Sequence, residues 1–237
     1  MEAATLSELS GGRFILGIGS ARVAGRMHGW KEGYLSTMRD NLRIVTSLLR
    51  GETVDYKGSV FQINGATLDP KPERVPVYVG CYPTSMMTLD IAAEYADGVI
   101  LLWVNADLIA KAVDRIDNRA KNLGRDPAKI DKAAYVILSV DRDREKARSA
   151  SMPLVEFYAN RIMDFWKSSS LIPDVPESAD TGWLTDKLTI SGTPSYCIEK
   201  LSELKQGGLK TPIFYQVLGP DPKKALKTIA KEIIPSL

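Results

Sequence analysis

Two glycine-containing segments are the places where a ligand could approach the backbone most closely. Residues 17–22 (GIGSAR) and residues 80–85 (GCYPTS) each follow an apolar run. The first has two glycines of a dinucleotide fingerprint, but Arg22 replaces the third, which argues against a Rossmann NAD site. The second leads into a helical pattern whose free N–H groups and flanking hydroxyls suit a phosphate. An ordinary capped turn explains the same residues, so both interpretations stay open.

Four single side chains could take part in chemistry, but each also has a structural explanation. We expect Cys81 to be a small buried hydrophobic residue rather than a reactive thiol. Trp103 follows another apolar run, where it either stacks on a ligand or packs in the core. His28 is the only histidine and is expected in a solvent-facing loop. Asp221 precedes a proline and is expected to cap a helix rather than act as an acid.

Short apolar runs alternate with helical patterns along the chain. Because these runs are almost continuously apolar, they predict strands that are covered on both faces, as in a parallel sheet. The predicted strands are Arg13–Ile18, Val75–Gly80, Gly98–Trp103, Ala133–Val140 and Pro212–Leu218. The predicted helices cover 30–50, 85–95, 107–122 and 142–166, and two more open at Thr193–Pro194 and Asp221–Pro222. Ligands of such folds bind at the carboxyl ends of the strands.

Two further segments complete the predicted organisation. Residues 53–63 predict a small hairpin, because β-rich triplets flank a Lys-Gly-Ser turn. Residues 167–186 are rich in serine, proline and aspartate and predict a long loop. We expect one α/β domain over residues 1–237.

Composition limits the classes of partner. The chain has 237 residues, is 44% hydrophobic, and carries 31 basic and 29 acidic residues, a net charge of +2. This balance gives no electrostatic case for nucleic acid or an anionic membrane. Two cysteines are too few for a disulfide scaffold or a usual zinc site. No apolar run approaches the ~18 residues of a spanning helix, and we expect no secretory signal at the amino terminus. We therefore expect a cytoplasmic protein with a small-molecule substrate and no metal.

Several segments resemble bacterial-luciferase-like oxidoreductases, which include flavin-dependent monooxygenases and F420-dependent reductases and dehydrogenases. Residues 4–20 (ATLSELSGGRFILGIGS) are similar to the region of that family's fourth strand, and residues 48–58 to its hairpin. Residues 77–99 resemble its fifth strand, the following helix and its sixth strand. Residues 192–194 and 218–222 match its C-terminal pattern. The LSGGRF and LGPDP segments favour a member similar to methylenetetrahydromethanopterin reductases.

The resemblance implies a (β/α)8 TIM barrel of which this chain carries strands 4–8, about five parallel strands. It also implies F420 or FMN as cofactor, bound at the strand carboxyl ends, and hydride transfer or monooxygenation as the reaction. The family's contacts to the cofactor ring and phosphate map to Gly19, Ser20, Gly80, Cys81, Tyr82, Pro83 and Thr84. Cys81-Tyr82-Pro83 departs from the family's small residue followed by Gly-Pro, and Trp103 stands where relatives often have asparagine. No catalytic residue can be carried over, because those positions lie in the first three βα units.

The three missing βα units leave three accounts open. The chain could continue upstream, another chain could complete the sheet, or the sheet could be open and repacked. Long apolar edges at Phe14–Ile18 and Ile213–Leu218 would invite pairing. We therefore expect a homodimer, or a partner chain that covers the open edges. The alternative function is a non-catalytic cofactor-binding or interaction protein derived from this family.

Overall fold

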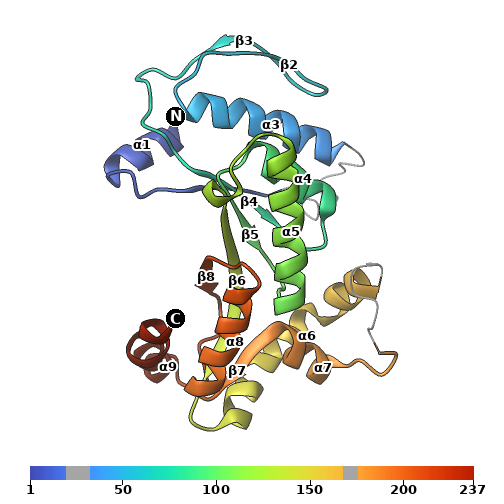
Figure 1. The fold of residues 1–237 in the computed structure, drawn as a ribbon. Coiled ribbons are helices and arrows are strands. Elements are labelled where there is room, and N and C mark those ends of the chain that lie inside the picture. Colours follow the sequence, from blue (N-terminus) through green and yellow to red (C-terminus); the bar gives the residue numbers. More distant parts are fainter. Residues whose placement is uncertain (20–32, 168–175) are drawn as a thin grey trace. The chain divides into compact units, whose positions relative to one another are not determined.

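The computed structural model describes residues 1–19, 33–167 and 176–237 (Figure 1). Its contacts divide the chain into two compact units. The first unit comprises Met1–Cys81, Ser85–Ile100 and Asp114–Lys132, and the second comprises Tyr82–Thr84, Leu101–Val113 and Ala133–Leu237. Helix α5 (Ala106–Asn122) and strand β6 (Asp131–Val140) each contribute residues to both units.

The first unit is built on parallel strands with helices between them. Strand β1 pairs in parallel with β4, and β5 and then β6 follow β4 in the strand order. Its elements are α1 (Glu2–Leu9), β1 (Leu16–Gly19), α3 (Tyr34–Leu49), β4 (Val77–Cys81), α4 (Met86–Tyr95), β5 (Gly98–Leu101) and the 3-10 turn η1 (Pro127–Lys129). Met38, Leu42 and Leu49, spaced four and seven residues apart on α3, are buried, and Leu42 has no exposed surface. This confirms the alternation of strands and helices expected for an α/β fold.

A small antiparallel hairpin, β2 (Val54–Lys57) and β3 (Gln62–Ala66), lies beside α3 in the first unit (Figure 1). Asp40 of α3 holds it: Oδ1 accepts a hydrogen bond from the Tyr56 hydroxyl at 2.7 Å. Oδ2 accepts from the N–H groups of Val60 at 2.7 Å and Phe61 at 3.1 Å. A Cβ at Gly58 would lie 2.3 Å from Asp40 Oδ2, so glycine is required where the turn meets this carboxylate. The predicted hairpin is confirmed, but its second strand extends to Ala66, beyond the predicted limit at residue 63.

A buried acid ties together the amino ends of β4 and β5. Asp97 is 8% exposed, and its Oδ2 accepts a hydrogen bond from the Val77 N–H at 3.0 Å. Its Oδ1 lies 2.5 Å from Arg74 and 3.5 Å from Arg50, which supply the compensating positive charge. Because these contacts lie at the end of the strands opposite the usual ligand site of a βα barrel, they belong to the stability of the fold.

The second unit is centred on β6. Residues Ala133–Val136 of β6 pair in parallel with β8, and residues Ile137–Val140 pair in parallel with β7. These two strands are β7 (Thr189–Gly192) and β8 (Thr211–Phe214). The helical elements of this unit are α6 (Arg144–Lys167), α7 (Thr181–Leu188), α8 (Pro194–Gln206), α9 (Pro222–Thr228), η2 (Ile229–Ile233) and η3 (Ile234–Ser236). The helix starts predicted at Thr193–Pro194 and Asp221–Pro222 are confirmed.

Residues 181–192 differ from the sequence-based expectation. The long loop predicted for 167–186 contains helix α7 from Thr181, and its N-cap Asp180 accepts a hydrogen bond from the Trp183 N–H at 2.8 Å. The buried Leu184 and Leu188 anchor α7 against Leu108 of α5 and Val155 of α6. Strand β7 follows directly, so the sheet has six strands rather than about five. Two leucines at helical spacing were the missed signal within this polar segment.

Several strands begin or end elsewhere than predicted. Strand β5 ends at Leu101 rather than Trp103, and β4 covers Val77–Cys81 rather than Val75–Gly80. Strand β8 stops at Phe214 rather than Leu218, and Gln216 has a left-handed backbone with φ 57°. Strand β1 begins at Leu16 rather than Arg13 and runs to Gly19. The strands of the described residues do not close into a barrel. None of the helices described is long and apolar enough to cross a membrane.

Candidate functional site

Gly19 and Gly80 lie opposite each other at the carboxyl ends of β1 and β4. The parallel register pairs Gly19 with Gly80 and Gly17 with Tyr78. Successive residues of a strand point to opposite faces, so these residues share one face of the strand pair. The two glycine-containing segments that the sequence singled out therefore meet at neighbouring strand ends.

The backbone at this face is open. A Cβ added at Gly17 or Gly19 would meet no described atom within 4 Å, and one at Gly80 would meet only the carbonyl oxygen of Ile18, at 3.9 Å. Packing within the described chain thus does not demand glycine at these positions. The backbone of these three glycines is therefore accessible at the strand ends.

Tyr78 bounds the glycine face toward β5. A Cβ at Gly98 would lie 2.7 Å from the Tyr78 ring, so the ring fills the space above that glycine. The hydroxyl donates to Asp131 Oδ2 at 2.9 Å, and burial, followed by this hydrogen bond, raises the pKa of Tyr78. The protonated Tyr78 side chain therefore has a structural role and limits the open space on the side of β5. The open space itself lies over Gly17, Gly19 and Gly80.

The thiol of Cys81 is buried and unreactive. Its side chain is 6% exposed, and burial raises the pKa of its thiol to about 12. A thiol of that pKa is protonated at neutral pH and is a poor nucleophile. The expectation of a small buried hydrophobic residue is confirmed, and any contact of Cys81 with a ligand would come from its backbone.

The segment after Cys81 leads to α4, whose amino end lacks a side-chain cap. Ser85 is the N-cap residue but makes no side-chain hydrogen bond to the helix. The first intrahelical hydrogen bond is donated by the Leu89 N–H to the Ser85 carbonyl at 3.0 Å, so the preceding N–H groups have no partner within the helix. Such N–H groups at a helix start suit an anionic group. The structure thus does not contain the capped turn that was the competing explanation of this segment.

The remaining predicted cofactor contacts are Tyr82, Pro83, Thr84 and Ser20. Tyr82, Pro83 and Thr84 are grouped with the second unit, and the hydroxyl oxygen of Thr84 is buried without a hydrogen-bond partner among the described residues. Ser20 lies outside the described residues, as does His28. In the part of the chain that is described, no group of three or more His, Cys, Asp or Glu side chains could hold a metal ion.

An aromatic cluster in the second unit was not found from the sequence. The rings of Trp103 and Tyr158 lie 5.2 Å apart, and those of Tyr135 and Tyr215 lie 4.7 Å apart. Only Trp103 was singled out beforehand. The four rings come from four separate segments, so no local pattern could have linked them.

Comparison with known proteins places the chain among enzymes. A family model described as luciferase-like monooxygenase matches residues 1–211. The chain is 33% identical, over 98% of its own length and 76% of the relative's, to the 5,10-methylenetetrahydromethanopterin reductase of Archaeoglobus fulgidus. The corresponding enzyme of Methanolobus tindarius is 32% identical over 97% of this chain and 76% of its own length.

Solved structures agree with these sequence relatives. The coenzyme F420-dependent tetrahydromethanopterin reductase of Methanopyrus kandleri superposes with a TM-score of 0.79 at 25% identity, over 98% of this chain and 77% of that one. An F420-dependent secondary alcohol dehydrogenase shares the fold, with a TM-score of 0.77 at 20% identity over 99% of this chain and 72% of that one. The α/β fold of the TIM-barrel type that the resemblance implied is confirmed. The chain therefore belongs to the luciferase-like monooxygenase family and is an oxidoreductase.

Proposed function

We propose that this protein is an F420-dependent reductase that acts on a tetrahydropterin carrying a one-carbon group, the chemistry of methylenetetrahydromethanopterin reductase. The observation that carries the proposal is the 33% identity to the Archaeoglobus fulgidus enzyme, which extends over 98% of this chain. Curated relatives at 24% identity are named F420-dependent glucose-6-phosphate dehydrogenases, which also favours F420 over FMN. A further solved structure, the oxygenating constituent of 3,6-diketocamphane monooxygenase of Pseudomonas putida in complex with FMN, is 18% identical and supports the fold alone.

The first unit offers a place for the cofactor. The open glycine face at Gly17, Gly19 and Gly80 would let the ring lie against the strand ends. The unpaired N–H groups at the start of α4 would hold the anionic part of the cofactor. We keep Ser20, Cys81, Tyr82, Pro83 and Thr84 as proposed cofactor contacts.

The cofactor supplies a hydride when it is bound in its reduced form. In the proposed reaction the hydride adds to the methylene carbon that bridges two nitrogens of the substrate. One carbon–nitrogen bond breaks, that nitrogen takes up a proton, and a methyl group remains on the other nitrogen. The contribution of this chain is to bind and orient the two reactants and to keep water from the hydride.

Binding and turnover test the proposal. Under anaerobic conditions, F420 should quench the protein's tryptophan fluorescence, whereas FMN should bind more weakly. With methylenetetrahydromethanopterin as substrate, the reduced cofactor should be oxidised at a rate proportional to protein concentration. A protein that binds F420 but reduces no tetrahydropterin would contradict the substrate, and a protein that binds no F420 would contradict the cofactor.

The variant Gly80→Val tests the position of the cofactor ring. The added side chain would occupy the open space next to Gly19, and it suits a strand backbone without a positive φ. We expect the Kd for F420 to rise at least about tenfold, because a steric clash of this kind costs roughly 1.4 kcal/mol or more. The melting temperature should change by only a few degrees. Ile18→Val, on the opposite face of β1, is the matched control and should leave the Kd for F420 unchanged.

A further inference from the structure

Two non-glycine residues among those described have a left-handed backbone. These are Trp103, with φ 56°, and Gln216, with φ 57°. Both belong to the second unit, and they follow the carboxyl ends of β5 and β8. A left-handed conformation is unfavourable for a bulky side chain and persists only where the surroundings hold it, which is common at ligand sites.

The conformation at Gln216 forms a tight turn. The Val217 N–H donates to the Tyr215 carbonyl oxygen at 2.7 Å, which closes a three-residue γ-turn around Gln216. With a positive φ at its centre this is the rare, strained form of the γ-turn. The turn ends β8 and leaves the Gln216 side chain exposed beside Tyr215.

Trp103 and the neighbour of Gln216, Tyr215, each take part in an aromatic pair. Trp103 contacts Tyr158 of α6 edge to face, with ring centroids 5.2 Å apart at 61°. Tyr215, next to Gln216, packs on Tyr135 of β6 at 4.7 Å and 37°. Tyr215 also interacts electrostatically with Tyr158, the partner of Trp103, and burial, followed by the interactions with Tyr158 and Tyr135, raises its pKa. We call Trp103, Tyr135, Tyr158 and Tyr215 the ring cluster.

The ring cluster is not closed off as a core would be. All four side chains are only partly buried. Because Tyr135, Tyr158 and Tyr215 are partly exposed and make no hydrogen bond through their hydroxyls to the described residues, these hydroxyls can bind water or a ligand. Phe157 extends the cluster outward: it is 79% exposed and meets the Tyr158 ring at 4.8 Å and 90°.

We propose that the ring cluster binds the pterin ring of the substrate and that Gln216 contacts the edge of that ring. The proposal rests on the proposed function. A pterin is a flat heteroaromatic ring with hydrogen-bond donors and acceptors around its edge. Aromatic faces bind it by stacking, and free tyrosine hydroxyls and an exposed amide can pair with its edge. The residues proposed for the cofactor ring, Gly17, Gly19 and Gly80, are not part of the ring cluster.

The variant Trp103→Asn tests the proposal, because asparagine removes the ring yet tolerates a left-handed backbone. Tyr158→Leu is a second variant that removes a ring without touching a strained residue. Trp103→Phe keeps an aromatic face at the same position. Trp183→Leu is the matched control: Trp183 packs on the same buried residues as Trp103, Leu108 and Val155 among them, but is not part of the ring cluster.

Isothermal titration calorimetry in the absence of cofactor gives the Kd for tetrahydromethanopterin. Fluorescence titration gives the Kd for F420. We expect Trp103→Asn and Tyr158→Leu to raise the Kd for tetrahydromethanopterin about tenfold or more, the usual effect of losing one stacked ring. Trp103→Phe should stay within about threefold, as expected when a smaller ring keeps part of the stacking. The Kd for F420 should be unchanged in every variant, and Trp183→Leu should bind both ligands like the unmodified protein.

Two results would overturn the inference while the proposed function stands. In the first, the ring variants bind tetrahydromethanopterin as tightly as the unmodified protein, which also turns over normally. In the second, the Kd for F420 rises instead, which would assign the cluster to the cofactor. If the unmodified protein binds F420 and does not bind tetrahydromethanopterin, the proposed substrate fails as well.

Discussion

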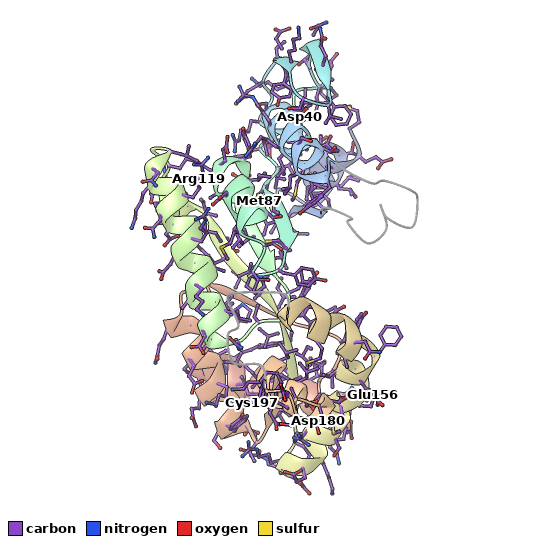
Figure 2. All side chains as sticks on the ribbon, turned by 90° about the vertical axis from the view of Figure 1, so that its right-hand side faces the viewer. Asp40, Met87, Arg119, Glu156, Asp180 and Cys197 are labelled. Carbon is purple, nitrogen blue, oxygen red and sulfur yellow. The ribbon has the colours of Figure 1, made fainter. Side chains whose placement is uncertain are left out.

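Asp40 shows how one side chain can hold two elements of the first unit together. It is 2% exposed, lies on α3 (Figure 2), and accepts hydrogen bonds from Tyr56, Val60 and Phe61 of the hairpin. Burial alone would raise the pKa of Asp40, but these hydrogen bonds outweigh it and lower the pKa below its ordinary value. The same hydrogen bond raises the pKa of Tyr56 to about 12. The ionised carboxylate is therefore the form that the fold stabilises.

The lowered pKa predicts acid sensitivity. A carboxyl group whose pKa is lower in the folded state stabilises the protein above its unfolded pKa of about 3.9 and loses that contribution as the pH falls through the folded value. Asp40→Asn should lower the free energy of unfolding at pH 7 by about 1–3 kcal/mol, since charged hydrogen bonds are lost. Between about pH 5 and pH 3 the variant should lose less stability than the unmodified protein.

Urea unfolding at several pH values measures this difference. Arg39→Gln is a suitable control, because Arg39 neighbours Asp40 in the chain but pairs with Glu94 at a distance of 3.9 Å. Equal acid sensitivity of Asp40→Asn and the unmodified protein would mean that Asp40 is not the acid-sensitive contact.

At the scale of elements, helix starts were the most predictable feature of the second unit. Asp221 accepts hydrogen bonds from the N–H groups of Lys223 and Lys224, both at 3.1 Å, and Pro222 follows as the first helical residue. Thr193 has the same place before Pro194 at the start of α8. Both starts were predicted, because a cap residue followed by proline satisfies local requirements that do not depend on the rest of the fold.

Asp221→Ala should destabilise α9 by about 1 kcal/mol, since alanine cannot accept from the two freed N–H groups. Asp221→Asn keeps an acceptor at the same place and should stay within about 0.5 kcal/mol of the unmodified protein. Urea unfolding followed by circular dichroism gives both values. If the alanine and asparagine variants lost stability equally, the carboxylate charge rather than the cap would be the stabilising feature.

At the scale of the whole molecule, each unit contains one buried cysteine. Cys81 lies in the first unit and Cys197 in the second, where Figure 2 labels it on α8. Burial raises the pKa of both thiols to about 12, so neither is a nucleophile at neutral pH. Their reactivity therefore reports the opening of each unit.

We expect the native protein to show no rapid reaction with a disulfide reagent at pH 8, because a thiol must be exposed and ionised to react. In guanidinium chloride both thiols should become reactive at the same midpoint, since α5 and β6 contribute to both units. Cys81→Ser and Cys197→Ser each leave one thiol and give the two midpoints separately. Midpoints that differ would show that the two units unfold independently.

The expected homodimer or partner chain stays a prediction. Leu6 and Leu9 of α1 are 46% and 79% exposed, and Ile15, just before β1, is 47% exposed. Exposed apolar side chains beside a strand are consistent with an association surface. Sedimentation analysis of the purified protein would determine its oligomeric state.

By itself, the sequence determined the α/β class, the parallel strands, the hairpin, the helix caps and the family. These depend on local spacing and composition, or on motifs such as LSGGRF, which adjacent residues carry. It also predicted that Cys81 is buried, because an uncharged cysteine inside an apolar run has no reason to be exposed. Helix α7 escaped prediction, since its two buried leucines lie in a polar segment and are anchored only by contacts with α5 and α6.

Only the tertiary structure decided which distant residues meet. The pairing of Gly19 with Gly80 depends on the register of two strands about sixty residues apart, and a shift by one residue would put the two glycines on opposite faces. The ring cluster joins Trp103, Tyr135, Tyr158 and Tyr215 from separate elements, and the left-handed backbone at Trp103 and Gln216 became visible only in the folded chain. Long-range contacts of this kind leave no local pattern, so the sequence could name single candidates but not the surface they form.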